Sequence, residues 1–397
     1  MKRAFAIVVA AAAILTGFQT YARAMSATRV VPVAPGGADY IGASNDVLAA
    51  HGFPPRPVAP FDSDRYQRWM RVMRAARVPL DVQFIPMQQL TPLRVFQPDW
   101  AGAVLFAPGA QPMRIPQYRF SEVEAEWTVP VAKPTINCSN RWEPSDGSSL
   151  WVGLDGWMST FVAHAKGKDG KYHTYDSTDV LQAGSESDVA CYSGGPIGNY
   201  PTSSYFWIEW AGTKNIAVRR NSRNLPVRAG DTIYVRIAAE TKGPAAWQRA
   251  TLWFVNETTG YYLPARTFHS GCVDCGTPYQ RPATLFGDTV EWMAEATFYS
   301  AEKKSLPNTL DDFGNVAMAG AYATDQDGTL YSPEQPGAAT ANIDWMTWQG
   351  TPLAQGGTLL ACSAIEGPST VTVARAPYVI ATPGQQGQLE PKPQRCR

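Results

Sequence analysis

From residue 100 onward, hydrophobic and polar residues alternate in short runs that end at glycine or proline, and this pattern predicts β-strands. In residues 150–156 the aliphatic side chains point to one face, whereas Trp151 and Asp155 point to the other. Similar alternation marks residues 205–210, 233–237 and 290–299, and residues 251–255 and 261–263 form a predicted hairpin. Helical periodicity is nearly absent from this part of the chain.

The second face of several predicted strands is polar and aromatic. Residues 290–299 place Glu291 and Glu295 opposite a set of apolar residues, and another predicted strand does the same with Trp207 and Glu209. Many short antiparallel strands with one apolar face predict an all-β fold, a two-sheet antiparallel β-sandwich of the concanavalin A-like or jelly-roll type. The concave outer face of such a sandwich can hold a cleft.

The composition supports strands and turns and argues against one class of partner. Lys+Arg and Asp+Glu number 34 each, so no net charge favours binding of a polyanion, and nucleic acid is not expected. A hydrophobic content of 45% supports a large core and excludes global disorder. The 33 Gly and 32 Pro favour short strands over long helices.

The N-terminus has the three-part pattern of an export signal. Residues 1–24 begin with Lys2 and Arg3, continue through 12 apolar residues and end with Ala22-Arg23-Ala24. Twelve residues fall short of the roughly 20 that span a bilayer, so we expect a cleaved signal peptide instead of a membrane anchor. The mature protein is therefore expected to be soluble, without a membrane partner, and secreted or periplasmic.

Residues 25–96 differ in charge from the rest of the chain. They contain eight Arg, no Lys and five Asp, whereas the chain from residue 97 onward has 23 basic and 29 acidic residues. We interpret this stretch as a basic, partly helical prosegment that is removable and acts as an intramolecular inhibitor. We expect its arginines to pair with carboxylates of the cleft at neutral pH.

One helix is predicted within that stretch, capped by Asp62 or Ser63 and stopped by Pro79. Its apolar residues at helical spacing are Tyr66, Trp69, Met70 and Met73, and the arginines around it are Arg65, Arg68, Arg71, Arg74 and Arg77. Two alternatives to a prosegment are a surface helix with a solvated basic face and a helix that lies on a membrane surface.

Six cysteines in an exported chain predict three disulfides, although the sequence selects none of the 15 connectivities that six cysteines allow. Cys272 and Cys275, with His269 nearby, also have redox or metal-ligand spacing, which leaves that alternative open. The Pro/Gly/Gln-rich residues 377–397 are expected to form a C-terminal tail, leaving residues 97–376 as one β-sandwich domain.

Only four histidines occur in the chain, and none lies in a recognisable nucleophile or zinc motif. The polar-aromatic strand face instead offers carboxylates beside tryptophan, which suit acid–base chemistry. Glu122, Glu124 and Glu126 also alternate on one strand face, in a pattern that mimics the spaced acids of β-sandwich glycosidases. We interpret these three as a solvated edge.

Six segments then occur in a fixed order along the chain. They are Trp100-Ala-Gly-Ala-Val-Leu105, Trp127-Thr-Val-Pro130, Trp151-Val-Gly-Leu-Asp-Gly156, Leu181-Gln-Ala-Gly184, Trp207-Ile-Glu-Trp210 and Glu291-Trp-Met-Ala-Glu295. Together they resemble the glutamic peptidases, the eqolisins, over residues 100–322. Six ordered motifs are far more specific than any one of them alone.

The resemblance implies roles for individual residues. Gln182 falls on the catalytic glutamine of the family and Glu295 on its catalytic glutamate, with Glu291 at the position of a supporting acid. Five further residues match cleft positions of the family, namely Trp100, Trp151, Asp155, Trp207 and Glu209. Glu186 lies where the family commonly has aspartate, a change that keeps the charge and lengthens the side chain.

The chemistry of such a pair follows from what amide hydrolysis requires. A base must take a proton from water, an acid must protonate the departing nitrogen, and a donor must stabilise the oxyanion. Glu295, with an ordinary glutamate pKa of about 4, could perform both proton steps, which places the working pH on the acid side. Gln182 would supply N–H donors that do not titrate.

The sequence therefore predicts a monomeric, exported acid endopeptidase that acts on denatured proteins and needs no metal or organic cofactor. By resemblance, pepstatin should not inhibit it. Two alternatives remain open, a β-sandwich glycoside hydrolase and a non-catalytic lectin-like module, because the same tryptophans and acids could bind a sugar.

Overall fold

The structure is a computed structural model that describes most of the chain from residue 40 onward. The described ranges are 40–61, 63–86, 100–108, 120–133, 144–157, 161–166, 172–177, 180–190, 202–210, 216–220, 223–240, 248–269, 285–296, 298–301, 304–307, 310–341, 343–344 and 359–375. The predicted signal peptide, the predicted tail and every cysteine except Cys362 lie outside these ranges. Two compact units divide the chain, residues 1–35 and 36–397, and the second contains all the described elements.

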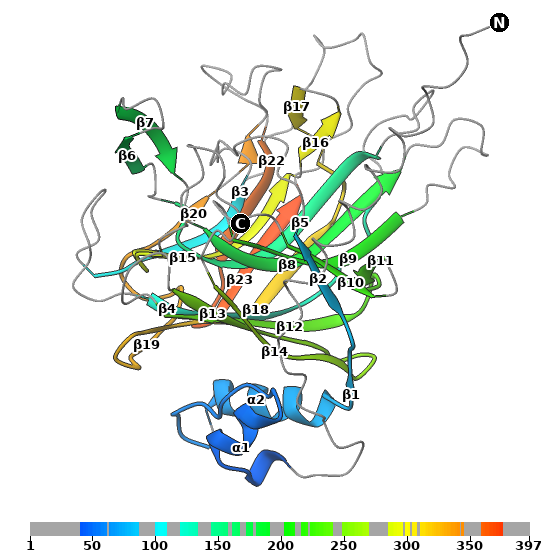
Figure 1. Ribbon diagram of the computed structural model, residues 1–397. Coiled ribbons are helices and arrows are strands. Elements are labelled where there is room, and N and C mark those ends of the chain that lie inside the picture. Colours follow the sequence, from blue (N-terminus) through cyan, green and yellow to red (C-terminus); the bar gives the residue numbers. More distant parts are fainter. Residues whose placement is uncertain are drawn as a thin grey trace, which may run out of the picture. The chain divides into compact units, whose positions relative to one another are not determined.

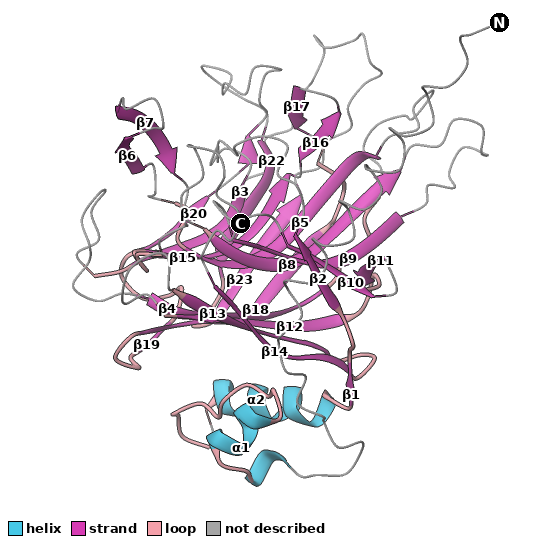
Figure 2. Ribbon diagram, in the orientation of Figure 1, coloured by secondary structure: helices cyan, strands magenta, loops and turns pink. Residues whose placement is uncertain are grey.

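Strands dominate this second unit, as Figures 1 and 2 show. A ten-stranded sheet has the order β1-β14-β13-β12-β4-β18-β23-β22-β21, with β19 paired to β18. Its strands are β1 (Val78–Pro79), β4 (Phe120–Thr128), β12 (Thr232–Ala239), β13 (Arg249–Asn256), β14 (Tyr261–His269), β18 (Asn315–Asp325), β19 (Leu330–Tyr331), β21 (Ile343–Asp344), β22 (Leu359–Ile365) and β23 (Thr370–Arg375).

A nine-stranded sheet has the order β2-β10-β11-β9-β8-β5-β15-β3-β20. Its strands are β2 (Gln83–Pro86), β3 (Trp100–Phe106), β5 (Pro144–Leu154), β8 (Leu181–Ala190), β9 (Thr202–Trp210), β10 (Ile216–Arg220), β11 (Arg223–Pro226), β15 (Thr289–Ala296) and β20 (Ala338–Ala341). Two separate hairpins join β6 (Phe161–Lys166) to β7 (Tyr172–Ser177) and β16 (Phe298–Ala301) to β17 (Lys304–Pro307).

One hydrophobic core fills the space between the two sheets, which confirms the predicted β-sandwich. The aliphatic residues of β5 lie in this core, as the alternation of the sequence predicts. Phe206 of β9 meets Phe254 of β13 across the layers, with ring centroids 4.3 Å apart. Two indole N–H groups also cross the core, because Trp127 donates to Ser185 Oγ at 3.0 Å and Trp292 donates to the Glu124 carbonyl at 3.0 Å. These contacts fix β8 and β15 against β4.

Most strand predictions hold, with one difference in length. The predicted hairpin is the antiparallel pair β13 and β14, and residues 205–210 and 233–237 belong to β9 and β12. The strand predicted over residues 290–299 is shorter, because β15 ends at Ala296 and Phe298 begins the separate strand β16. Pairing decides this boundary, since β16 pairs with β17 and not with the sheet.

The N-terminal elements are a short 3-10 helix, Tyr40–Gly42, and two α-helices, α1 (Asn45–Ala50) and α2 (Asp64–Ala75). Ser63 caps α2, because its hydroxyl accepts from the Tyr66 N–H at 3.2 Å, and the helix ends before Pro79 as predicted. Tyr66, Trp69 and Met73 are buried. No helix among the described residues is long and apolar enough to cross a membrane.

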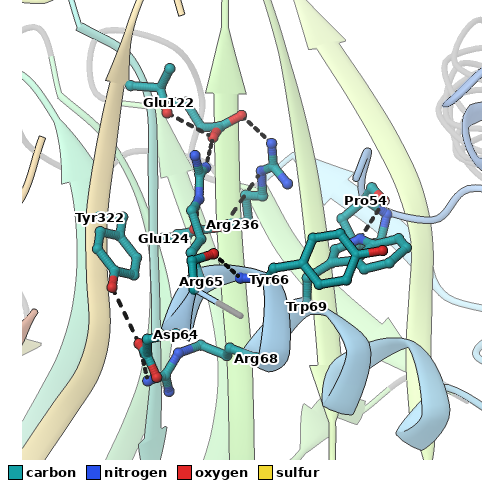
Figure 3. Close-up of polar contacts among 12 residues, drawn as sticks. Pro54, Asp64, Arg65, Tyr66, Arg68, Trp69, Glu122, Glu124, Arg236 and Tyr322 are labelled. Carbon is teal, nitrogen blue, oxygen red and sulfur yellow. Dashed lines mark hydrogen bonds and ion pairs between the residues drawn. The ribbon is translucent and has the colours of Figure 1, made fainter. Parts of the chain in front are cut away.

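Arg65 and Arg68 of α2 lie on the outer face of the ten-stranded sheet (Figure 3). Arg65 binds Glu122 and Glu124 at 2.6 Å each, and Arg68 binds Glu126 at 3.2 Å. The glutamates alternate with core residues on β4, which is a central strand between β12 and β18. The prediction that these three glutamates form a solvated edge is therefore wrong, because α2 and Arg236 of β12 cover their carboxylates.

One alternative for this helix and one expectation about its arginines are also wrong. Arg65 and Arg68 are only 7% exposed, so the basic face of α2 is not solvated as a whole. The arginines with described acidic partners on the sandwich pair with β4, not with carboxylates of the polar-aromatic face, which belongs to the other sheet. The basic N-terminal stretch does pair with acidic residues of the sandwich, but the ion pairs form on β4 of the ten-stranded sheet instead of at the polar-aromatic face.

Candidate active site

The polar-aromatic residues gather on the outer face of the nine-stranded sheet, where strand register arranges them in three rows across β9, β8, β5 and β15. The first polar row contains Glu209, Gln182, Gly153 and Glu291. The aromatic row contains Trp207, Gly184, Trp151 and Met293. The second polar row contains Tyr205, Glu186, Ser149 and Glu295, and continues to Trp100 of β3.

Trp151 connects the three rows. Its buried indole donates from Nε1 to Glu295 Oε2 at 2.8 Å, and its ring extends toward Gly153 in the first polar row. A Cβ atom at Gly153 would lie 2.8 Å from this ring, so glycine leaves the space that the indole occupies. Trp100 packs edge-on against Trp151, with ring centroids 4.8 Å apart. Glu295 is therefore held on a rigid aromatic support.

Gln182 is almost fully buried in the first polar row. Its Nε2 donates to Glu209 Oε2 at 3.1 Å, and its Oε1 has no hydrogen-bond partner among the described residues. An amide nitrogen carries two N–H groups, so the second donor remains for another acceptor. The structure thus places Glu209 as the residue that orients the Gln182 amide.

Gln182 and Glu295 lie on the same face of the sheet but not opposite each other. On β5, Gln182 is level with Gly153 and Glu295 is level with Ser149, four positions away. On a flat sheet this corresponds to about 13 Å along the strands and about 10 Å across two strand spacings. The residue level with Glu295 on β8 is Glu186.

Asp155 binds backbone N–H groups at the start of β15. It is fully buried with φ of 62°, and its carboxylate accepts from the backbone N–H groups of residues 286–289 at 2.6, 3.0, 2.8 and 3.5 Å. Its own N–H donates to the Thr289 carbonyl at 2.9 Å. These bonds fix the start of β15, the strand that carries Glu291 and Glu295.

Glu291 is fully buried. Burial raises the pKa of Glu291 well above its ordinary value; the Thr289 side chain opposes this rise, whereas the nearby Asp288 charge adds to it. A neutral carboxyl at this position fits a supporting acid better than a group that exchanges protons with a substrate.

Glu186 belongs to a second acidic group beside Glu295. Burial raises the pKa of Glu186 to about 8, the Asp188 charge adds to the rise, and a hydrogen bond with Tyr205 opposes it. Burial also raises the pKa of Asp188 to about 6. No three His, Cys, Asp or Glu side chains of the described ranges are arranged to bind a metal ion.

Three of the residues that build this site were not singled out from the sequence. Asp188 and Tyr205 each lie two positions from a predicted site residue on the same strand face, so extending the alternation by one step would have found them. Ser149 accepts from Trp207 Nε1 at 2.7 Å and donates to the Ser185 carbonyl at 3.4 Å. A buried serine gives no comparable signal in the sequence.

Comparison with known proteins identifies the family. Residues 98–375 match the model of the Peptidase A4 family. Among solved structures, the chain is similar to SCP-B, a member of the eqolisin family of peptidases in a complex with the tripeptide Ala-Ile-His, at 17% identity and a TM-score of 0.40. It is also similar to scytalido-glutamic peptidase with a peptide-based transition-state analogue, at 15% identity and a TM-score of 0.37.

Each of these two similarities covers 70% of this chain and 98% of the other. No curated protein matches. The family match spans well over half of the 397 residues and includes all six ordered motifs. The chain therefore belongs to the Peptidase A4 family, the glutamic peptidases or eqolisins.

Proposed function

We propose that the protein is an acid endopeptidase in which Glu295 activates water for attack on a peptide bond. The observation that carries this proposal is the fixed carboxylate of Glu295, which is partly exposed and accepts from the Trp151 indole at 2.8 Å. A donor at one oxygen favours the ionised form of the carboxylate, and an ionised carboxylate is what a general base requires.

Gln182 is proposed to donate to the oxyanion that forms on the attacked carbonyl. Its support is an oriented amide with one N–H that has no described partner. Losing one such donor typically costs about 2.7–4 kcal/mol of transition-state stabilisation. Gln182 and Glu295 are offset by four positions along the strands, so their side chains must reach toward each other across the aromatic row to act on one peptide bond.

The test is hydrolysis of a denatured protein at acid pH by the wild type, Glu295→Gln and Gln182→Ala. Both variants should retain the fold and lose most turnover, and a Glu295→Gln enzyme with wild-type rates would refute the proposal. Polysaccharide incubated in parallel checks the glycoside hydrolase and lectin-like alternatives. Pepstatin and chelators should leave the mature enzyme unaffected.

Export and maturation belong to the same proposal. We propose that residues 1–24 are removed on export and that residues 25–96 are an inhibitory prosegment. The support is the charge division of the sequence, and part of this segment binds the sandwich through the ion pairs between α2 and β4. Because α2 lies on the other sheet, inhibition does not act through its arginines at the site. Mass spectrometry of protein acidified in steps should show shortening near residues 90–100.

A further inference from the structure

Residues 40–86, the N-terminal segment, precede the family match yet add a strand to both sheets of the sandwich. β1 pairs in parallel with β14 at one edge of the ten-stranded sheet, where Val78 is level with Tyr261. β2 pairs antiparallel with β10 at one edge of the nine-stranded sheet, where Pro86 is level with Ile216. The segment is therefore part of the two-layer architecture.

The segment also contributes to the hydrophobic core. Leu80 and Val82 follow β1 and precede β2, are 4% and 6% exposed, and belong to the core between the two sheets. The backbone N–H of Leu80 donates to the Tyr262 carbonyl at 2.8 Å. Loss of the segment would expose apolar surface on the sandwich that remains, and the burial of such surface is the main force that holds protein chains together.

The region around α1 and α2 contacts strands that lie within the family match. Phe53, between the two helices, stacks on Tyr262 of β14 with ring centroids 5.0 Å apart. Arg236 of β12 donates from Nη1 to the Pro55 carbonyl at 3.1 Å. Aromatic and polar contacts thus join the segment to two strands of the ten-stranded sheet.

The sandwich has space for the arginines of α2. Gly320 of β18 has φ of 60°, and a Cβ atom there would collide with the Arg68 guanidinium group, so glycine leaves the room that this group occupies. Arg68 reaches Glu126 of β4 at 3.2 Å. The guanidinium carbon of Arg65 lies over the Tyr322 ring of β18, 5.9 Å from its centroid. β4 and β18 therefore receive two arginines of the segment in a shaped site.

The charges on this surface are balanced by the segment. Glu122 and Glu124 share two cations, Arg65 of α2 and Arg236 of β12. Without α2, Arg236 is the cation that remains beside these two carboxylates among the described contacts. Like charges held close together repel each other. The exposed surface of the sandwich would therefore carry unbalanced negative charge if the segment left.

We propose that the N-terminal segment remains bound to the sandwich as a separate chain after the connection between Pro86 and Trp100 is cut. The interaction surface consists of the outer face of β4, β12 and β18 together with the edges that β14 and β10 present to β1 and β2. This inference rests on the maturation in the proposed function and deepens it. The cut ends the covalent connection and leaves the segment in place, so inhibition by residues 25–96 depends on the intact connection.

The first experiment cuts the full chain without relying on its own activity. A recognition sequence for a site-specific protease is inserted between Gln88 and Gln89 in a Glu295→Gln background, and the protease is added to the folded protein. At about 1 μM protein and pH 7, the two chains should elute together from a gel-filtration column and appear in equal amounts on a denaturing gel. A fragment that elutes separately overturns the proposal.

Variants of the cut protein identify the contacts that hold the segment, with the Kd measured by dilution. Arg65→Gln combined with Arg68→Gln should weaken the Kd by at least about 100-fold, because buried carboxylates lose their nearest cations. Arg68→Gln alone is the milder variant and should weaken the Kd in the same direction. Arg74→Gln is the matched control, since Arg74 is exposed on the same helix, and its Kd should stay within about threefold of the parent value. Equal Kd values for the arginine variants and this control would overturn the assigned surface.

A second experiment uses the active protein. Wild-type protein is acidified until it shortens near residues 90–100 and is then returned to pH 7, where the N-terminal fragment should still elute with the sandwich. If the fragment is lost while the sandwich stays folded, this proposal fails and the endopeptidase proposal stands. If the active protein never shortens, the proposed maturation fails, whereas the inserted cleavage site still decides whether the segment stays bound.

Discussion

Replacing Arg65 by Gln tests whether the ion pairs between α2 and β4 stabilise the fold of the full chain. Arg65 donates from Nε to Glu124 Oε1 and from Nη2 to Glu122 Oε1, both at 2.6 Å, and its side chain is only 8% exposed. Glutamine cannot supply the positive charge. The change therefore leaves the almost fully buried Glu124 carboxylate without its nearest cation.

The expected cost follows from what Glu124 keeps. Removing one partner of a buried ion pair typically costs about 3–5 kcal/mol. Glu124 would still accept from the Tyr234 hydroxyl at 2.6 Å and face Arg236 Nε at 3.7 Å. We therefore expect a loss near the lower limit, about 3 kcal/mol in the free energy of unfolding.

Urea unfolding of the full chain measures this loss. Both variants are made in a Glu295→Gln background, so that self-cleavage cannot remove the helix. Arg74→Gln is the matched control, because Arg74 lies on the same helix, is exposed and has no ion pair among the described contacts. Its free energy of unfolding should change by less than about 0.5 kcal/mol.

The pH dependence provides a second check on the same pair. Burial alone would raise the pKa of Glu124, but Arg65, Arg236 and the Tyr234 hydroxyl outweigh it and lower the pKa. A lowered folded-state pKa stabilises the fold above the unfolded value, about 4.3 for glutamate, and this contribution is lost as pH falls through the folded value. The difference between wild type and Arg65→Gln should persist from pH 7 to 5 and shrink in stronger acid. Equal stability of the Arg65→Gln and Arg74→Gln variants, or a difference that is unchanged at pH 3, would refute this reasoning.

Three further predictions concern the candidate site. Gly184→Ala should prevent accumulation of folded protein, because a Cβ there would lie 1.9 Å from the Leu150 carbonyl oxygen, whereas Gly42→Ala meets nothing within 4 Å and should express normally. Glu291→Gln should have the same free energy of unfolding in urea as the wild type at pH 4 and a larger one at pH 7. The raised folded-state pKa of Glu291 favours folding below the unfolded value and destabilises the folded wild type increasingly as pH rises. A wild-type pH profile in this variant would contradict a neutral Glu291. Asp155→Ala should lose at least about 2 kcal/mol in the free energy of unfolding, since four backbone N–H groups lose their acceptor, and a loss below about 0.5 kcal/mol would exclude the supporting role.

The sequence alone determined the local features of the fold. The two-residue period of a strand fixes which side chains share a face, so the core side of β5 and the polar-aromatic side of β15 could both be predicted. Asp62 or Ser63 marked the start of α2, where Ser63 is the cap, because capping depends on residues within one helical turn. The six ordered motifs also indicated the family, and the match over residues 98–375 confirmed it.

The tertiary structure decided every feature that depends on partners far apart in the chain. Glu124 is buried because β4 is a central strand and α2 covers it, and neither fact follows from alternation within one strand. Asp155 finds its donors more than 130 residues away. The offset of Gln182 from Glu295, and the shared row of Glu186 with Glu295, depend on the register of three strands. Periodicity fixes the face of a residue, whereas only the pairing of strands fixes its position along the sheet.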